Sequence, residues 1–280
     1  KDLKKICNQN KILLIEDSAI YYGNYTDKEG KRIMAGSFGD VSLLSFGIMK
    51  NISALYGGAL ATSNENLTIF AKKKIDEYDN FSKLLYLKQI ILFFLLKFLL
   101  SKYVYNLFFY YIIKISSLKE ISLIQKLIYP SMKFKIKDKL PKSYYSKISN
   151  TSIKLIDQLI TDKRSIEDEI IRKKNNKIYF SRLKTTDKIM LFPLNDINFQ
   201  NLLDFPIVVK NKKGLINYLF KNGIEVRSFF YDNCEVIVGD NNNINAANLE
   251  KNLICLPSHS SMNEKTIFKI CNHVNNFYLN

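Results

Sequence analysis

The sequence has few of the residues from which metal centres and disulfide frameworks are built. Its 280 residues include only four cysteines and two histidines, and no two cysteines have C-x-x-C spacing. Zinc sites need clusters of such ligands, so we expect no metal site. The scattered cysteines do not resemble a disulfide framework, and no charged-then-apolar signal segment opens the chain. These absences favour a reducing, cytoplasmic setting.

Acidic residues are also scarce relative to basic ones. The chain has 26 Asp and Glu residues against 42 Lys and Arg residues, which gives a formal charge of +16. This charge suits anionic partners such as nucleotide-sugars, phospholipid surfaces or nucleic acid. Most of the excess is lysine alongside many Asn, Ile and Tyr residues, a bias that an AT-rich genome also produces. No helix-turn-helix pattern, zinc spacing or RNP-like aromatic motif accompanies the lysines, so we expect no nucleic-acid binding.

Three short apolar runs near the N-terminus end in polar or small residues. The run from Ile12 to Ala19 closes with two carboxylates, and the run from Val41 to Phe46 contains the hydroxyl of Ser45. Lys50 follows five residues later, and the pair Gly57–Gly58 leads into a third run. Buried parallel strands show this pattern when their last residues emerge at the edge of a sheet where a site lies.

Asp17, Ser45 and Lys50 would bring an acid, a hydroxyl and an amine to this edge. Pyridoxal phosphate needs these three groups, for its ring nitrogen, its phosphate and its aldehyde. Each residue also has a structural interpretation. A lysine after a strand is usually a solvated surface residue, and an aspartate at a strand end is usually a turn or helix cap. Spacing alone favours the structural interpretation.

Four segments resemble the signature of the DegT/StrS family of pyridoxal-phosphate-dependent sugar aminotransferases. The family pattern is an E-D-x-A strand end, a G-S-x-G-D turn, an S-F-x-x-x-K-N loop and a G-G-A-x-x-T strand. This chain carries LLIEDSA, GSFGDVSLLSFGIMKNI and GGALAT, in the same order and spacing. The resemblance implies an α/β fold of the aspartate-aminotransferase-like type, which is fold type I of the pyridoxal-phosphate transferases.

The resemblance also implies a role for each candidate residue. Asp17 falls where the family's acid pairs with the cofactor's ring nitrogen, and Ser45 where a hydroxyl binds the cofactor's phosphate. Lys50 falls where the lysine forms an imine with the cofactor and later moves a proton. A minority of the family are dehydratases with histidine in place of this lysine, so Lys50 argues against that branch.

The implied activity is amino transfer to a nucleotide-linked keto sugar in cell-surface glycan or polysaccharide biosynthesis. The amino donor would be a small molecule such as glutamate, and the family usually works as a homodimer with sites at the subunit interface.

Three features depart from the family pattern. Ile20 stands where the family usually has Gln or His, and Tyr56 where a glutamate commonly precedes the glycine pair. The chain also opens inside an α/β unit, because residues 1–10 have the pattern of a helix end with Asn8 and Asn10 as the break. We therefore expect a truncated or split protein without the N-terminal half of the large domain. The alternative hypothesis is a catalytically incomplete relative that acts as an interaction or membrane-associated protein.

The segment from Leu84 to Ile115 is almost wholly apolar and aromatic. Its length suffices to cross a bilayer, but its longest stretch without lysine is eleven residues, from Tyr103 to Ile113. A lysine at the bilayer centre costs roughly 3 kcal/mol, which disfavours a transmembrane span. Two other interpretations stay open: peripheral contact with the inner face of the membrane, with lysines reaching the headgroups, or packing on protein.

The pattern predicts five parts along the chain. They are the remaining part of the cofactor-binding large domain at 1–83, an apolar helical insert at 84–128, a connector at 129–149, an interdomain helix at 150–183, and a small α+β C-terminal domain at 184–280.

Several elements and residues of the small domain carry expectations of their own. We expect strands at 201–211, 223–226 and 252–257, a helix that ends at Gly223, and a final helix. Ser261 or Asn263 should cap the final helix, and His259 should make a loop hydrogen bond. Arg227 is a surface arginine or reaches a substrate carboxylate or phosphate.

Overall fold

The computed structural model describes most of the chain in two compact units. The described residues are 2–26, 29–48, 50–119, 121, 139–162, 164–191, 202–226, 232–235, 239 and 243–279. One unit comprises Lys1–Leu99 with Lys137–Glu167, and the other comprises Leu100–Ile136 with Asp168–Asn280. We call these the first and the second unit. The first part of the connector, 129–138, lies outside the described residues.

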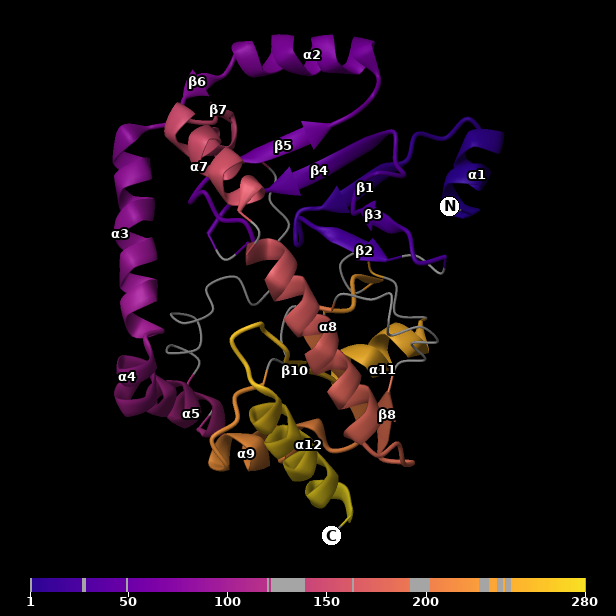
Figure 1. Ribbon diagram of the computed structural model, residues 1–280, viewed down its shortest axis with the longest axis vertical. Helices are drawn as coiled ribbons and strands as arrows, with labels where there is room; N and C mark the ends of the chain where they lie inside the picture. The colour runs from indigo at the N-terminus through magenta and orange to yellow at the C-terminus, as the bar shows by residue number, and fades with distance from the viewer. Residues whose placement is uncertain are drawn as a thin grey trace. The chain divides into compact units, whose positions relative to one another are not determined.

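The first unit contains a three-stranded sheet, with one helix before its first strand and another after its last strand (Figure 1). Its elements are α1 (Asp2–Gln9), β1 (Ile15–Ser18), β2 (Asn24–Thr26), β3 (Arg32–Met34), β4 (Val41–Ser45), β5 (Gly58–Ala61), α2 (Glu65–Asp76), β6 (Asp79–Asn80), α3 (Lys83–Leu99), η2 (Lys142–Tyr144), β7 (Ser146–Lys147) and α7 (Asn150–Thr161).

The three predicted strands near the N-terminus are confirmed as β1, β4 and β5. In the sheet order β1-β4-β5, β1 runs parallel to β4 and β5 runs antiparallel to it. The prediction that the first strand is buried is wrong for this chain. Ile12, Leu13 and Ile15 are each more than half exposed, because the described part of the unit places no layer of side chains over them.

The predicted helix over 150–183 is two helices. α7 ends at Thr161, and α8 (Arg164–Arg182) begins three residues later. Asp162 has φ −72° and ψ 127°, an extended conformation that stops the helical hydrogen bonding of α7. The apolar spacing continues across this break, so periodicity alone could not find it.

The second unit contains an antiparallel sheet in the order β10-β9-β8. Its elements are α4 (Lys102–Val104), the π-helix η1 (Tyr105–Phe109), α5 (Tyr110–Leu118), most of α8, β8 (Ile189–Leu191), β9 (Asp204–Val209), α9 (Lys212–Lys221), α11 (Ile244–Asn252), β10 (Leu253–Pro257) and α12 (Glu264–Leu279).

Apolar side chains from the sheet and the helices of the second unit form one core. β9 alternates between half-buried and buried residues, as expected for a strand with one face on a core. Near the start of β9, Phe205 stacks on Tyr179 of α8, with ring centroids 5.0 Å apart. The core residues are Tyr179, Leu183, Ile189, Phe205, Ile207, Val209, Leu215, Leu219, Ile224, Val226, Ile254, Leu256, Ile267, Ile270, Cys271, Val274 and Tyr278.

Most predicted elements of the small domain are confirmed. The strands at 201–211 and 252–257 are β9 and β10, the helix before Gly223 is α9, and the final helix is α12. Gly223 has φ +80°, a conformation that suits glycine and ends the helix. The expected strand at 223–226 is wrong, because Ile224 and Val226 enter the core from a segment without strand pairing.

The apolar segment is divided between the two units. Its first half is α3 of the first unit, on which no residue is buried. Its second half packs on α9 of the second unit, where the Tyr110 hydroxyl donates to the carbonyl oxygen of Phe220 at 2.5 Å and the Tyr105 hydroxyl bonds to Glu225. Ile113 of α5 is buried. Packing on protein is therefore confirmed for one face of this second half.

None of the described helices is by itself long and apolar enough to cross a membrane. The consecutive helices Lys83–Leu99 and Lys102–Leu118 pass that test only as a pair with a bend between them, by length and composition alone.

Candidate functional site

Asp17 and Ser45 lie on the same face and at the same edge of the first sheet. β1 and β4 are parallel, and Asp17 pairs in register with Leu43. Ser45 is two residues beyond Leu43, so it shares the face of Leu43 and of Asp17. Both strands end here, since β1 closes at Ser18 and β4 at Ser45. The structure thus brings together two of the three predicted site residues.

The carboxylate of Asp17 is exposed. Its Oδ1 accepts a hydrogen bond from the backbone N–H of Ala19 at 3.0 Å. This bond turns the chain directly after β1 and leaves the second carboxylate oxygen open to solvent or a ligand. Asp17 therefore acts in part as the turn cap that spacing alone suggested, and it is also placed to meet a cationic group above this face.

Glu16 projects to the opposite side of β1 and has a different role. Its Oε2 accepts the backbone N–H groups of Phe38 and Gly39 at 2.6 and 2.5 Å. A side chain at Gly39 would meet the Leu14 carbonyl oxygen at 2.9 Å, so the turn requires glycine here. The acid of the E-D pair that precedes Asp17 thus holds the G-S-F-G-D turn against the strand.

Asp40 fixes the same turn to α1 and to the start of β1. Its Oδ1 accepts from the Lys4 ammonium at 2.5 Å, and its Oδ2 accepts from the backbone N–H of Leu14 at 2.9 Å. The hydrogen bond from Lys4, followed by that from Leu14, holds the pKa of Asp40 below its usual value. Asp40 is therefore a structural carboxylate of the site's scaffold.

This lowered pKa predicts a pH effect. A carboxylate whose pKa is lower in the folded state stabilises that state above its unfolded pKa of about 4, and loses this contribution as pH falls through the folded value. Wild type should therefore lose urea resistance below about pH 4 more steeply than Asp40→Asn. Urea midpoints from circular dichroism between pH 3 and pH 6 measure this, and parallel curves for the two proteins would contradict it.

Lys50 lies on a closed loop that follows β4. The Phe46 N–H donates to the Gly57 carbonyl oxygen at 2.9 Å, and the Ala54 N–H donates to the Phe46 carbonyl oxygen at 2.8 Å. Phe46, Ile52 and Ala54 form a small core that packs against three residues of α7, which are Leu155, Ile156 and Leu159. Bonds across its base and apolar packing on α7 therefore fix the loop.

Asn51 ties the lysine loop to the chain that leaves β1. Its Oδ1 accepts the N–H of Tyr22 at 2.9 Å, and its Nδ2 donates to the carbonyl oxygen of Tyr22 at 2.5 Å. Tyr22 also contacts Phe46, with ring centroids 6.1 Å apart. Asn51 therefore couples the position of Lys50 to the segment that begins with Asp17. The K-N pair of the family pattern includes Asn51, but it did not indicate the contact with Tyr22.

This contact predicts a local change when Asn51 is removed. Asn51→Ala should speed amide exchange at Tyr22 by roughly fivefold, because the lost hydrogen bond contributes about 1 kcal/mol to local protection. Hydrogen-exchange mass spectrometry of the peptide around Tyr22 measures this. Asn64→Ala, which removes the N-cap of α2, is the matched control and should leave Tyr22 unchanged. Equal exchange in Asn51→Ala and wild type would exclude the clamp.

The Lys50 side chain is half-buried, and among the described residues its ammonium makes no hydrogen bond or ion pair. These residues fit pyridoxal phosphate. Asp17 and Ser45 provide a carboxylate and a hydroxyl on one face at the end of the strands, and Lys50 provides an amine on the fixed loop that follows.

The two residues that depart from the family pattern, Ile20 and Tyr56, have different environments. Ile20 is exposed. The Tyr56 ring stacks on Phe81, with centroids 3.8 Å apart, and its hydroxyl donates to the Ser143 carbonyl oxygen at 2.9 Å. Burial raises the pKa of Tyr56. Tyr56 therefore holds the connector on the first unit.

The remaining candidates lie in the second unit or outside the described residues. His259 Nδ1 bonds to the Ser261 hydroxyl at 2.6 Å, which confirms the loop hydrogen bond. Asn263 caps α12, since its Oδ1 accepts the N–H of Thr266 at 2.9 Å. Arg227 lies outside the described residues.

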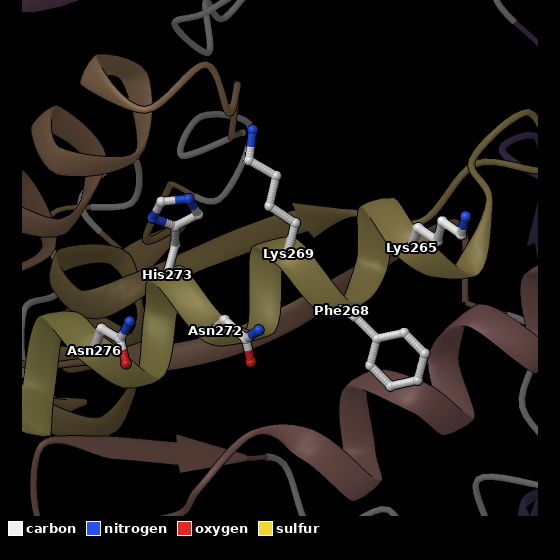
Figure 2. Close-up of a pocket in the computed structure, with 6 residues that line it drawn as sticks. All are labelled: Lys265, Phe268, Lys269, Asn272, His273 and Asn276. Carbon is white, nitrogen blue, oxygen red and sulfur yellow. The ribbon is translucent and has the colours of Figure 1, made fainter.

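A shallow groove of about 420 Å³ runs along one face of α12 in the second unit (Figure 2). It is lined by Lys265, Phe268, Lys269, Asn272, His273 and Asn276. None of these is a candidate site residue, and the side chains in Figure 2 all come from this one helix. In the part of the chain that the structure describes, no group of three or more His, Cys, Asp or Glu residues is arranged to hold a metal ion.

Known proteins resemble this chain in sequence over its N-terminal part and in fold over nearly its whole length. Residues 1–82 match the model of the DegT/DnrJ/EryC1/StrS aminotransferase family. No curated protein matches the chain.

Three solved structures illustrate the likeness in fold. The aminotransferase TlmJ from Streptoalloteichus hindustanus is 15% identical with a TM-score of 0.62, over 98% of this chain and 62% of that one. Helicobacter pylori PseC, an aminotransferase involved in pseudoaminic acid biosynthesis, is 15% identical with a TM-score of 0.58, over 99% and 62%. DesI, solved in the presence of its TDP-sugar product, is 13% identical with a TM-score of 0.60, over 98% and 57%.

The chain spans about three fifths of the length of these solved structures. At such identities the likeness concerns the fold, while the match of residues 1–82 concerns the family. The resemblance of the E-D-x-A, G-S-x-G-D and K-N segments is thereby confirmed. We place residues 1–82 in the DegT/DnrJ/EryC1/StrS aminotransferase family, and the chain has the fold of the fold type I pyridoxal-phosphate-dependent aminotransferases.

Proposed function

We propose that this protein is a pyridoxal-phosphate-dependent aminotransferase that transfers an amino group to a nucleotide-linked keto sugar. The observation that carries this proposal is the shared face and edge of Asp17 and Ser45, followed by the uncommitted amine of Lys50 on a fixed loop. The family match of residues 1–82 supports the reaction class. The substrate class is supported by DesI, whose structure was solved with a TDP-sugar product.

Each of the three residues has one task in this proposal. Lys50 would hold the cofactor through its Nζ at the aldehyde carbon, with loss of water, and its amine, once displaced by the amino donor, would move a proton at the carbon that bears the nitrogen. Asp17 holds a positive charge on the ring nitrogen through a charge-assisted hydrogen bond. Ser45 donates its hydroxyl to the phosphate. When bound, the cofactor supplies a ring that withdraws electrons from the carbon losing a proton.

The fixed geometry explains why the scaffold contacts matter for this chemistry. Glu16 and Asp40 hold the turn between β1 and β4, and Asn51 holds the lysine loop to the exit of β1. A proton can be moved efficiently only when the amine stays within hydrogen-bond reach of the carbon. The Asn51 contacts therefore hold the loop that carries Lys50 to the segment after β1 before any ligand binds.

The proposal extends to the partners and the setting. We propose glutamate as the amino donor, a role in cell-surface glycan or polysaccharide biosynthesis, a homodimer whose subunits complete each other's sites, and a cytoplasmic location. Peripheral contact of residues 84–115 with the membrane is also a proposal. It is supported by the exposed apolar residues of α3.

A second candidate function is that of a catalytically incomplete relative that acts as an interaction or membrane-associated protein. Ile20, where the family usually has Gln or His, favours it. Both candidates require the fold described above, but only the first requires Lys50 to react with an aldehyde.

Trapping of the cofactor separates the two candidates. Wild type mixed with pyridoxal phosphate and then borohydride should carry one stable adduct, which peptide mapping should place on Lys50. Lys50→Ala should lose that adduct, while the control Lys72→Ala, on the exposed surface of α2, should keep it. A label spread evenly over surface lysines, or none at all, would favour the incomplete relative.

A further inference from the structure

We propose that the exposed apolar stripe of α3 docks on the surface of an anionic lipid bilayer. The stripe consists of Leu84, Leu87, Ile91, Phe94 and Phe98, which we call the α3 stripe. Its residues follow one another at alternating spacings of three and four, so they share one face of the helix. Each is between 51 and 61% exposed in the first unit.

Exposure of this kind is unusual for a soluble helix. Five large apolar side chains on one face, with no buried residue anywhere on α3, form a contiguous apolar surface. Such surfaces mark sites of contact with a partner or a membrane. The second half of the apolar segment differs, since Tyr105 and Tyr110 bind it to the α9 region of the second unit.

The charges around the stripe identify the partner as anionic. From Lys83 to Lys119 the chain contains six lysines and no aspartate or glutamate. At about 100° per residue, Lys83 and Lys97 fall on one side of the α3 stripe and Lys88 on the other. Lysines in these places extend along an apolar surface and reach phosphate headgroups with their ammonium ends.

A second copy of α3 fits this surface less well. Two such helices packed through their stripes would bring lysines into the flanking positions, where paired helices normally carry opposite charges. No acidic residue of α3 is present to compensate them. Lipid phosphates supply the missing negative charge, and an acyl boundary accepts leucine and phenylalanine side chains at once.

The length of α3 defines how it meets the bilayer. Its 17 residues measure about 25 Å, which is less than the roughly 30 Å hydrocarbon core. With lysines on both sides of the stripe, the helix lies along the interface with the stripe directed inward. This mode requires neither a transmembrane span nor any change in the fold of the first unit.

Vesicle flotation of the full 280-residue chain tests the proposal. Wild type should float with vesicles of phosphatidylcholine and phosphatidylglycerol, and its partition coefficient should be at least about tenfold lower with phosphatidylcholine alone. Leu87→Gln/Ile91→Gln/Phe94→Gln should lose at least about tenfold on the anionic vesicles, because three apolar side chains leave the acyl boundary. High salt should weaken wild-type binding.

The matched control replaces three exposed apolar residues of α2, which carries acidic as well as basic residues. Ile69→Gln/Phe70→Gln/Ile75→Gln should float like wild type. Circular dichroism of each variant confirms that it is folded. Equal flotation of the α2 and α3 variants would overturn the proposal, as would recovery of wild type in the soluble fraction with both vesicle types.

Sedimentation velocity without lipid tests the alternative that a second copy of the chain packs on the α3 stripe. If the α3 triple variant converts a dimer to a monomer and wild type ignores vesicles, the stripe is an interface between two copies and the lipid proposal is wrong. The result is independent of the proposed enzymatic function, because none of the substituted residues is Asp17, Ser45 or Lys50 and the readout is vesicle binding.

Discussion

Replacing Asp17 with asparagine should lower the rate of amino transfer from glutamate by about a thousandfold, which corresponds to ~4 kcal/mol. Asparagine has nearly the same shape but no charge, so it cannot hold the ring nitrogen of the cofactor in its protonated form. Stopped-flow absorbance with the pyridoxal-phosphate-loaded chain measures the half-reaction. Borohydride trapping at Lys50 should persist in this variant, because the lysine needs only the aldehyde.

Glu16→Gln is the matched control for this prediction. Glu16 is adjacent in sequence but projects to the other side of β1, where its Oε2 accepts two backbone N–H groups. Its replacement should reduce stability and leave the rate of the folded fraction within a few-fold of wild type. A rate loss in Glu16→Gln as large as that in Asp17→Asn would show that the two acids act together on the scaffold and not separately.

The largest effect on stability should follow from Phe205→Ala in the second unit. Phe205 is 1% exposed, lies near the start of β9 and stacks on Tyr179, so alanine would leave a cavity that the surrounding sheet cannot fill. Large-to-small changes of this kind cost about 3–5 kcal/mol. Met190→Ala, on the half-exposed side of β8, should cost less than about 1 kcal/mol.

The stability of Phe205→Ala must be measured by a method that reports on each of the two units separately. The chain has no tryptophan, so hydrogen-exchange mass spectrometry in increasing urea is the suitable measurement. Peptides from β9 and β10 should lose protection at lower urea in Phe205→Ala, while peptides from β1 and β4 should follow the wild-type curve. Loss of protection in both sets at the same urea concentration would mean that the units unfold as one.

The effects expected for Asp17 and Glu16 show why adjacent acids in a motif cannot be assigned the same role. Side chains alternate between faces along a strand, and the register of β1 with β4 places Asp17 with Ser45 and Glu16 with the turn at Gly39. The sequence resemblance singled out Asp17 through the family motif. It did not indicate that Glu16 would cap the turn, because that contact joins residues more than twenty positions apart.

The apolar segment, which is divided between the two units, also shows what sequence composition could not predict. Residues 84–115 share one composition, yet α3 keeps an exposed stripe while η1 and α5 contact the α9 region through Tyr105 and Tyr110. Composition predicted an apolar surface in both halves. The half that packs on protein is identified only by the tertiary structure. There the Tyr110 hydroxyl donates a hydrogen bond to the carbonyl oxygen of Phe220, more than one hundred residues away.

The local features of the secondary structure could be predicted from the sequence by itself. The strands at β1, β4 and β5, the helix stop at Gly223 and the cap at Asn263 were all foreseen, because short-range patterns and single residues determine such features. Tertiary structure alone decided the break at Asp162, the exposure of Ile15 and the clamp between Asn51 and Tyr22. These depend on which distant segments pack together, and packing is a property of the whole fold that no local pattern contains.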